Sequence, residues 1–543
     1  MEDQPLRNGV TAVLYPLLLA FVMAGGYYLG TLQSNKSDTG HANNAVGLLK
    51  LNRVLNEIEV KYVDSIESDQ LVETSIGGIL HNLDPHSSYI PAKDLSYMDE
   101  PLKGSFGGVG IRFMILRDTL IATSVVESGP SQKSGVLAGD RIIAIDDSAI
   151  TNIGLKNVDV LDKLKGEIGT HVKVTVFRTP TNETIPIDII RGSVPIKSVE
   201  SAQIISEGVG YIKLVRFAEP TPLEFDLAAK KLLNNGMEKL ILDLRDNGGG
   251  YLQPAVQIVD QFLKNGKMIV YTEGRHNGRV NNFATTNGRL EETELIVLIN
   301  ENSASASEIV AGAVQDNDRG MILGRQSFGK GLVQEPILLS DGSSIRLTVA
   351  RYYTPSGRCI QRPYGNGVDY NADYLERYEN GEFYTIDSSK LEKLDKFETA
   401  GGRIVYGGGG IFPDIFIPLD TNGSSSYLSA LSYTASFTEF AFEYVDENRK
   451  SLNTFRNAQD YDNTFVISEN MFADFVLYAE EHHQIKRSPY GLVASKERIK
   501  TRLKAQIALN VWGNNGMYTV YNKKDRTVIR AIEEVARVNF INR

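Results

Sequence analysis

Residues 295–334 read LIVLINENSASASEIVAGAVQDNDRGMILGRQSFGKGLVQ, and their pattern predicts a strand, a tight turn and a helix in succession. The apolar run 295–299 is short, rich in β-branched residues and bounded by polar ones, which favours a buried strand. Serines and alanines fill residues 303–307, and the apolar positions of residues 308–314 then recur at helical spacing. A serine at such a junction is well placed as a nucleophile, because nearby backbone N–H groups can bind a developing oxyanion.

The end of this stretch places Lys330 between two glycines, in the string SFGKGLVQ at residues 327–334. Glycines on both sides allow neighbouring backbone to approach closely. Burial in an apolar setting disfavours the ammonium and lowers the pKa of a lysine, so that a neutral amine can act as the base for a serine hydroxyl. Gln334 is placed to orient that amine as a third member of the group.

The strings SASASEI at residues 303–309 and SFGKGLVQ at residues 327–334 resemble the carboxyl-terminal processing peptidases, or tail-specific proteases. These are serine peptidases with a Ser–Lys dyad. In that family the nucleophile precedes the lysine by 25 positions, and counting back from Lys330 selects Ser305. The resemblance therefore implies Ser305 as nucleophile, Lys330 as general base and Gln334 as the residue that orients the lysine.

Two further strings resemble the same family, LDPHSSY at residues 83–89 and LILDLRDNGGG at residues 240–250. The second is an apolar strand that ends in a glycine cluster, and glycines there free backbone amides to point at a ligand. The resemblance implies an oxyanion hole made by the amides of Gly249 and Ala306. Because the family often has proline where this chain has Gly248, the choice between Gly248 and Gly249 stays open.

Several polar residues near these motifs are interpreted as structural. Ser303 and Ser307 are neighbours of the nucleophile, and His86 is a turn histidine, because a Ser–Lys pair leaves no vacancy for a histidine base. Asp316 is a secondary site candidate for which a role at the helix end is favoured. Cys359 is the single cysteine of the chain, so it cannot form an internal disulfide, and it is interpreted as a packed thiol.

Residues 103–192 resemble a PDZ domain. The string FGGVGI at residues 106–111 resembles its carboxylate-binding loop, which places Gly108, Val109, Gly110 and Ile111 at the ligand. Successive backbone N–H groups in such a loop capture a C-terminal carboxylate, and the peptide then adds as a strand. The resemblance implies protein substrates bound by their C-terminal tails, with a helix over residues 158–165 as the other wall of the groove. Arg191 is a candidate for coupling tail binding to the dyad on its position alone.

Composition and other motifs limit the remaining possibilities. A net charge of −10 argues against a nucleic-acid partner. Residues 324–330 match the phosphate-loop pattern G-x-x-x-x-G-K, but Gly331 stands where Ser or Thr would hold magnesium, so nucleotide binding is the weaker alternative. The H-E-x-x-H and G-x-S-x-G patterns are absent. No metal or organic cofactor is implied.

Residues 10–32 read VTAVLYPLLLAFVMAGGYYLGTL and carry no charge. This length is enough to cross a hydrocarbon core of about 30 Å as a helix. The pattern predicts a single-pass anchor in a bacterial cell membrane, and a cleaved signal peptide is the rival interpretation. The family resemblance implies that the catalytic part is extracytoplasmic, in the periplasm.

The length of 543 residues indicates several domains. The predicted fold class is α/β, with a crotonase/Clp-like peptidase core, an inserted PDZ domain and an α-helical C-terminal extension that packs or forms a homo-oligomer. The predicted divisions are an N-terminal tail (1–9), the anchor (10–32), a linker (33–44), an N-terminal helical part of the peptidase (45–102), the PDZ domain (103–192), the peptidase core (193–420) and the extension (421–543).

The predicted function is a serine endopeptidase that cleaves protein substrates near or from their C-termini. The rival from another class is a catalytically silent PDZ adaptor that binds protein tails. The presence of both dyad residues at the family separation argues against the adaptor.

Overall fold

We describe the chain from a computed structural model, which describes residues 20, 22–24, 38–179, 181–286, 288–365, 368–370 and 372–537. The chain forms two compact units, Met1–Leu83 and Asp84–Arg543, and each is considered by itself. The first unit contains the helices α2 (Asp38–Lys61) and α3 (Ser68–His81).

The predicted membrane anchor is corrected by the structure. Among the described residues, none of the helices combines the length and the apolar character that a bilayer span requires. Helix α2 has 24 residues but carries charged side chains such as Lys50, Arg53 and Glu57, which a spanning helix would bury in lipid at high cost. Most of the segment 10–32 lies outside the described residues, since only 20 and 22–24 of it are described. On this finding the predicted single-pass membrane location is wrong.

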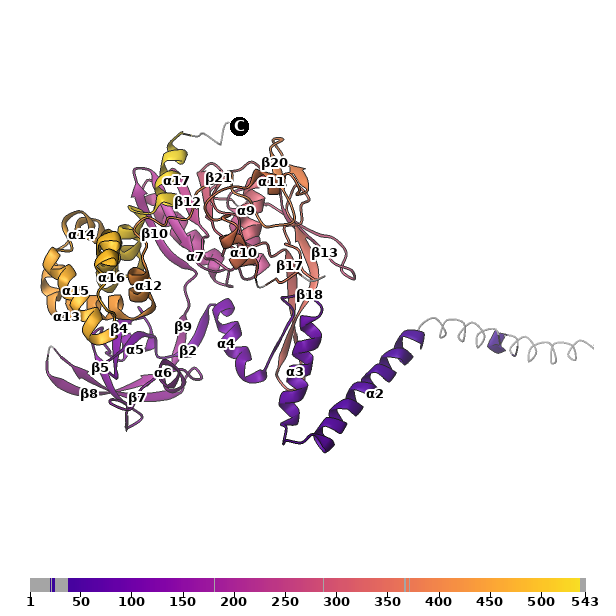
Figure 1. Cartoon of the computed structure of the whole chain (residues 1–543), viewed down its shortest axis with the longest axis horizontal. Helices are drawn as coiled ribbons and strands as arrows, with labels where there is room; N and C mark the ends of the chain where they lie inside the picture. Colours follow the sequence, from indigo (N-terminus) through magenta and orange to yellow (C-terminus); the bar gives the residue numbers. More distant parts are fainter. Residues whose placement is uncertain are drawn as a thin grey trace, which may run out of the picture. The chain divides into compact units, whose positions relative to one another are not determined.

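A six-stranded sheet forms the centre of the core in the second unit (Figure 1). In spatial order its strands are β10 (Val199–Ser206), β11 (Val209–Leu214), β12 (Lys239–Asp243), β15 (Glu294–Ile299), β16 (Met321–Gly324) and β21 (Ile415–Phe416). Strand β10 pairs antiparallel with β11, and every other neighbouring pair is parallel. Parallel strands need cover on both faces, and β11 and β15 are indeed buried at every residue.

Helices from distant parts of the sequence supply that cover. One face packs against α7 (Thr221–Asn234), α8 (Leu252–Asp260) and α9 (Ala306–Asp316). The other face packs against α17 (Arg526–Arg537), through Val528, Ala531 and Val535. The last described helix of the chain is therefore part of the core.

A second sheet belongs to the same unit. Its strands are β1 (Ser88–Ile90), β13 (Met268–Glu273), β14 (Val280–Phe283), β17 (Leu332–Leu338) and β18 (Ser344–Tyr353). Strand β18 pairs with β17 and with β1 and β13. The segment that follows β18 contains α10 (Asp373–Glu379), α11 (Ser388–Leu391), β19 (Lys396–Glu398) and β20 (Ile404–Tyr406).

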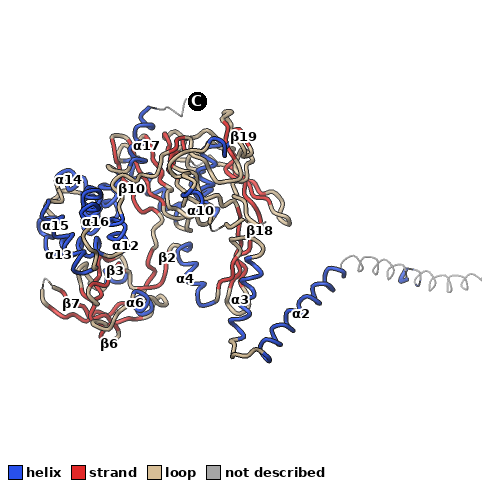
Figure 2. Tube along the Cα trace, viewed as in Figure 1, coloured by secondary structure: helices blue, strands red, loops and turns tan. Residues whose placement is uncertain are grey.

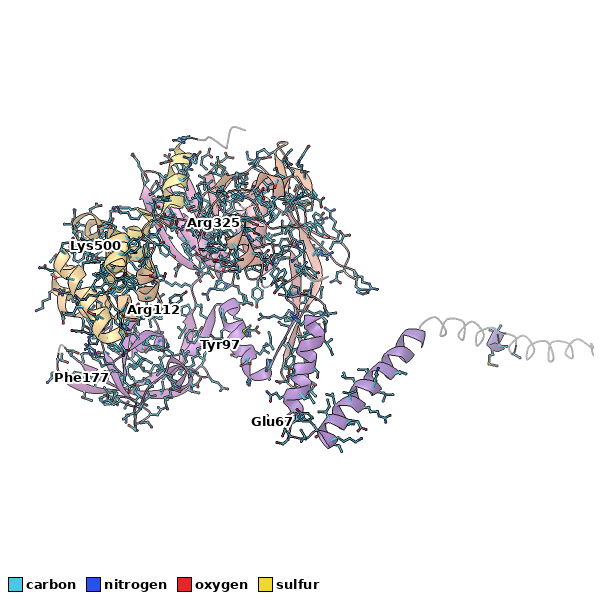
Figure 3. All side chains as sticks on the ribbon, in the orientation of Figure 1. Glu67, Tyr97, Arg112, Phe177, Arg325 and Lys500 are labelled. Carbon is cyan, nitrogen blue, oxygen red and sulfur yellow. The ribbon has the colours of Figure 1, made fainter. Side chains whose placement is uncertain are left out.

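Helix α4 (Ala92–Lys103) leads into a separate β-rich domain, which is inserted between the paired strands β2 (Ser105–Gly108) and β9 (Gly192–Pro195). The domain contains β3 (Ile111–Leu116), β4 (Thr119–Val125), β5 (Arg141–Ile145), β6 (Ser148–Ala149), β7 (His171–Arg178), β8 (Glu183–Ile190), α5 (Pro130–Lys133) and α6 (Asn157–Leu164). Its main sheet has the order β3-β4-β5-β7-β8, which leaves β3 at an edge. Figure 3 labels Arg112 on β3 and Phe177 on β7.

The last part of the described chain is a helical region, whose helices are blue in Figure 2. Before α17 it contains α12 (Ser426–Tyr433), α13 (Ser436–Leu452), α14 (Ala458–Thr464), α15 (Glu469–His483) and α16 (Pro489–Asn522). Ile499, Leu503 and Ile507 recur on one face of α16 and are fully buried in the core of this region. The helical extension that the spacing of these residues predicts is thus present.

Candidate active site

The turn between β15 and α9 presents Ser305. Its φ of 55° lies in the left-handed region, where a residue with a side chain is strained by about 1–3 kcal/mol. A sharp strand-to-helix turn of this kind exposes the hydroxyl of its serine at the end of a sheet. The hydroxyls of the neighbouring Ser303 and Ser307 are buried and donate to the carbonyl oxygens of Leu244 and Asn247, at 2.8 Å each. Of these three described serines, Ser305 is the one that lines the cavity beside the turn.

Lys330 lies on the loop that leads into β17. The backbone of this loop passes so close to neighbouring chain that both residues next to Lys330 have to be glycines. A Cβ at Gly331 would lie 2.9 Å from the backbone nitrogen of Gln361. Gly329 has a φ of 89°, and a Cβ there would lie 3.2 Å from the backbone nitrogen of Gly410. The close backbone approach predicted on both sides of the lysine is therefore present. Because Lys330 is followed by a strand and not by a helix, the phosphate-loop alternative is wrong.

Ser305 and Lys330 line the same cavity, which has a volume of about 380 Å³. Lys330 Nζ donates to Gln334 Oε1 at 2.9 Å, and among the described residues no hydrogen bond joins it to Ser305 Oγ. Burial lowers the pKa of Lys330, and the positive charge of Arg346 lowers it further. A lysine in this setting can be a neutral amine near neutral pH.

The cavity is lined by both polar and apolar side chains. The apolar side chains belong to Leu102, Leu252, Ile309, Leu332, Val333 and Pro336. Asp99 and Arg346 stand opposite each other in the same lining and form an ion pair of 3.1 Å. The cavity thus combines apolar surface with one charged pair.

Glu308, which the motif search left without a role, ties the serine turn to the lysine loop. Its buried carboxylate accepts hydrogen bonds from the backbone nitrogens of Ser305 at 2.8 Å, Gly329 at 2.7 Å and Lys330 at 2.9 Å. Burial raises the pKa of Glu308 to about 7, against these hydrogen bonds and one from Ser327, which act to lower it. One carboxylate therefore fixes the backbone of both dyad residues.

Tyr352 is a second residue of this kind that the sequence did not reveal. Its hydroxyl oxygen lies 2.5 Å from the carbonyl oxygen of Lys330 and 3.1 Å from that of Ser305. The sequence did not indicate this role, because Tyr352 fits the alternating pattern of β18 like any other residue of the strand. The signal for Glu308 was present, as a glutamate three residues after a serine at a helix start.

The glycine cluster after β12 packs against the serine turn. A Cβ at Gly249 would lie 2.8 Å from Ser305 Cβ and 3.0 Å from the backbone nitrogen of Ala306. The amide of Gly249 donates to Asn247 Oδ1 at 2.9 Å, and the Asn247 carbonyl oxygen accepts from Ala304 N at 3.0 Å. The structure thus brings Gly249, Ser305 and Ala306 together as the sequence predicts, although the amide of Gly249 has a partner within its own loop.

The two secondary candidates lie elsewhere. Asp316 ends α9, where it is fully buried in an ion pair of 2.7 Å with Arg358 and accepts from the hydroxyl of Ser356 at 2.7 Å. Arg191 donates to the carbonyl oxygens of Lys163 at 2.8 Å and His171 at 2.9 Å within the inserted domain. Asp316 therefore holds a loop at the helix end, and a role for Arg191 in coupling tail binding to the dyad stays a prediction.

The predicted carboxylate-binding loop joins β2 to β3 beside the last turn of α6. A Cβ at Gly108 would lie 3.7 Å from the carbonyl oxygen of Leu164. The carbonyl oxygens of Val109 and Gly110 accept backbone hydrogen bonds of 2.9 Å each. Because the C=O and N–H of a trans peptide point in opposite directions, the amides of Gly110 and Ile111 point away from those partners. The loop therefore offers two successive amides next to the free edge of β3.

Four family matches cover separate parts of the chain. Peptidase family S41 matches residues 208–373, and the PDZ domain matches residues 107–189. The activating protease CtpB N-terminal domain matches residues 22–94, and a family of unknown function matches residues 427–513.

A carboxy-terminal-processing protease of Bartonella bacilliformis is 39% identical over 319 residues, which cover 58% of this chain and 72% of that protein. The chain belongs to the carboxy-terminal processing proteases. The carboxy-terminal processing protease CtpA of Bacillus subtilis is 29% identical over 354 residues, which cover 65% of this chain and 73% of that protein. Among solved structures, the photosystem II D1 C-terminal processing protease is 31% identical and covers 56% of this chain and 83% of its own, with a TM-score of 0.34.

These matches and the structure confirm the fold class of the protease, a peptidase core with an inserted PDZ domain and a helical C-terminal region. They also support proteolysis better than the adaptor alternative. The exact domain boundaries and a homo-oligomer through the helical extension stay predictions.

Proposed function

We propose that this protease is a serine endopeptidase that cuts protein substrates near or from their C-termini, with Ser305 as nucleophile and Lys330 as general base. The observation that carries the proposal is the shared cavity, which is lined both by a serine on a strained turn and by a buried lysine whose pKa is lowered. Activation of a serine hydroxyl needs such an adjacent base.

The chemistry balances with these two side chains and water. Ser305 Oγ attacks the scissile carbonyl carbon while the neutral amine of Lys330 takes the hydroxyl proton. The resulting ammonium gives that proton to the departing amine, which leaves an acyl-enzyme. Water then attacks the ester with the same lysine as base, and the Ser305 hydroxyl is restored. Before the first step Ser305 Oγ and Lys330 Nζ have to come within hydrogen-bond reach, and such distances often shorten only when substrate is bound.

Backbone amides would stabilise the tetrahedral oxyanion. Ala306 follows the nucleophile at the start of α9, where the helix dipole favours negative charge. Gly249 packs on the serine turn, and its amide would have to turn from Asn247 Oδ1 toward the oxyanion or share its hydrogen between both. Removal of one such donor costs about 10²–10³-fold in kcat in other hydrolases.

The PDZ domain would hold the tail of the substrate. The amides of Gly110 and Ile111 can bind a terminal carboxylate, and the free edge of β3 can pair with the residues before it. The apolar part of the cavity lining favours a substrate with apolar residues next to the scissile bond.

A cleavage assay tests the proposal. The full chain is incubated with an unstructured protein that ends in apolar residues, alongside Ser305→Ala and Lys330→Arg, which keeps a cation but cannot act as a neutral base. We expect cleavage by the wild type and by Cys359→Ser, a control that removes the only thiol, and none by the two dyad variants. Tail binding without Ser305-dependent cleavage would instead establish the adaptor.

A further inference from the structure

The side-chain amide of Gln334 is held at both of its ends. Its Oε1 accepts from Lys330 Nζ at 2.9 Å, and its Nε2 donates to the carbonyl oxygen of His86. A carbonyl oxygen can only accept, so a flipped amide would place two oxygens against each other there. The His86 carbonyl therefore decides which end of the amide faces the lysine.

The turn that carries this carbonyl is itself fixed. Asp84 Oδ1 accepts from the backbone nitrogens of His86 at 2.8 Å and Ser87 at 2.9 Å, and Asp84 Oδ2 accepts from the Ser87 hydroxyl at 2.6 Å. The Ser87 hydroxyl oxygen in turn accepts from the backbone nitrogen of Thr348 on β18 at 3.1 Å. The turn is thus anchored to the strand that pairs with β17, which carries Gln334.

The imidazole of His86 contacts Tyr370, which lies in the segment that follows β18. Its Nε2 lies 2.9 Å from the hydroxyl of Tyr370, and the two rings meet edge to face with centroids 5.2 Å apart. The guanidinium of Arg362 lies 3.8 Å above the Tyr370 ring and 4.1 Å above that of Phe328, two residues before Lys330. Through Arg362, Tyr370 therefore packs next to the loop that carries Lys330.

The ring of His86 is neutral near neutral pH. Burial and the positive charges of Lys330 and Arg362 together lower the pKa of His86 to about 4, against the charge of Asp84, which raises it. A neutral ring adds no positive charge beside Lys330. With Nε2 occupied by Tyr370 and the ring outside the residues that line the catalytic cavity, His86 is not a base for Ser305.

We propose that His86 and Tyr370 are positioning residues for the catalytic lysine. The Tyr370 hydroxyl binds the imidazole of His86, and this contact keeps the turn that carries His86 in place. The His86 carbonyl oxygen then orients the Gln334 amide so that Gln334 Oε1 accepts a hydrogen bond from Lys330. The nitrogen lone pair of Lys330 is then left for the Ser305 hydroxyl. The segment after β18 thereby acts on catalysis without touching the substrate. This inference rests on the proposed role of Lys330 as base.

The test uses Tyr370→Phe, which keeps the ring under Arg362 but removes the hydroxyl, together with His86→Ala and His86→Gln. A glutamine keeps a polar end that can reach the Tyr370 hydroxyl. Tyr374→Phe is the matched control, because Tyr374 lies in the same segment and packs on Phe383 instead. The readouts are kcat and KM for the tail-bearing substrate and the rate at which a small fluorophosphonate labels Ser305.

We expect Tyr370→Phe and His86→Ala to lower kcat and the labelling rate by about tenfold, with KM unchanged. Loss of a residue that orients a functional group through a hydrogen bond has an effect of about this size. His86→Gln should recover most of the loss, and Tyr374→Phe should behave as the wild type. If Tyr370→Phe, folded by circular dichroism, labels and turns over within twofold of the wild type, the inference is wrong. Labelling of Ser305→Ala as fast as the wild type would instead overturn the proposed dyad.

Discussion

At the scale of single residues, the charge of Arg346 acts on Lys330, and both residues line the same cavity. Arg346 disfavours a second cation nearby and so lowers the pKa of Lys330, in addition to burial. Its guanidinium is held in place by the ion pair with Asp99. Burial and the charge of Arg346 both favour the neutral amine that the proposed base requires, and a single substitution removes the second of these effects.

We expect Arg346→Gln to raise the pKa of Lys330 and to move the rising limb of kcat against pH upward by about one pH unit, worth about 1.4 kcal/mol. Activity at pH 7 should fall, while activity above the limb should be retained. The measurement is kcat from pH 6 to pH 10, with Arg117→Gln in the PDZ domain as the control. A limb that does not move would mean that Lys330 is not the group that titrates.

Glu308 makes a second prediction at this scale, on stability. Its pKa in the folded chain is about 7, against an ordinary value of 4.5. The stability that the protonated carboxyl contributes is fully present below about pH 4.5 and is lost as the pH rises through about 7. The difference in urea midpoint between the wild type and the uncharged Glu308→Gln should therefore shrink from pH 5 to pH 8. A constant difference would contradict the raised pKa.

At the scale of elements, the turn after β12 and the turn before α9 pack directly against each other. A Cβ at Gly249 would lie 2.7 Å from the carbonyl oxygen of Ala304 and 2.8 Å from Ser305 Cβ, and Gly249 has a φ of 99°. A Cβ at the adjacent Gly248 meets nothing within 4 Å. The two glycines therefore differ in packing although they are neighbours in one motif.

We expect Gly249→Ala to displace the serine turn and to lower kcat at least 10²-fold, the scale of a lost oxyanion donor. Gly248→Ala should retain most of the activity and serves as the control. Both variants should keep a native circular dichroism spectrum, because the sheet and its covering helices are not touched. Equal losses of kcat in the two variants would show that the close contact between Gly249 and the serine turn is not the cause.

At the scale of the whole second unit, the helical region holds the PDZ domain. Phe442 of α13 is 2% exposed because it packs against Leu116 and Ile121 of the PDZ sheet. Beside this contact, Arg141 pairs with Asp446 at 2.9 Å. The region that matches a family of unknown function therefore fixes the domain proposed to bind the tail.

We expect Arg141→Asp, which faces Asp446 with a second carboxylate, to weaken this contact by about 1 kcal/mol, the upper range for a partly exposed pair. The double variant with Asp446→Arg should restore it. Scanning calorimetry measures the effect as a lower first transition in the single variant and a wild-type transition in the double one. If the double variant unfolds like the single one, the ion pair does not hold the domain.

The sequence by itself determined the parts of this protein that depend on local pattern and on motifs with fixed spacing. The apolar run at 295–299 and the helical spacing after it gave the strand, the turn and α9, because burial on a sheet and on a helix imposes different periods. The resemblance to the processing peptidases, whose nucleophile precedes the lysine by 25 positions, selected Ser305, which lines the cavity. The PDZ motifs indicated the inserted domain, and a PDZ family match confirms its presence.

Only the tertiary structure decided which distant residues meet. Glu308 and Tyr352 bridge the serine turn and the lysine loop, and Tyr370 reaches His86 across 284 positions of sequence. Such contacts carry no periodic signal, because they arise when separate elements close on one another and buried polar groups must find partners. The predicted membrane anchor is corrected by a separate finding, since none of the described helices has both the length and the apolar character of a membrane span.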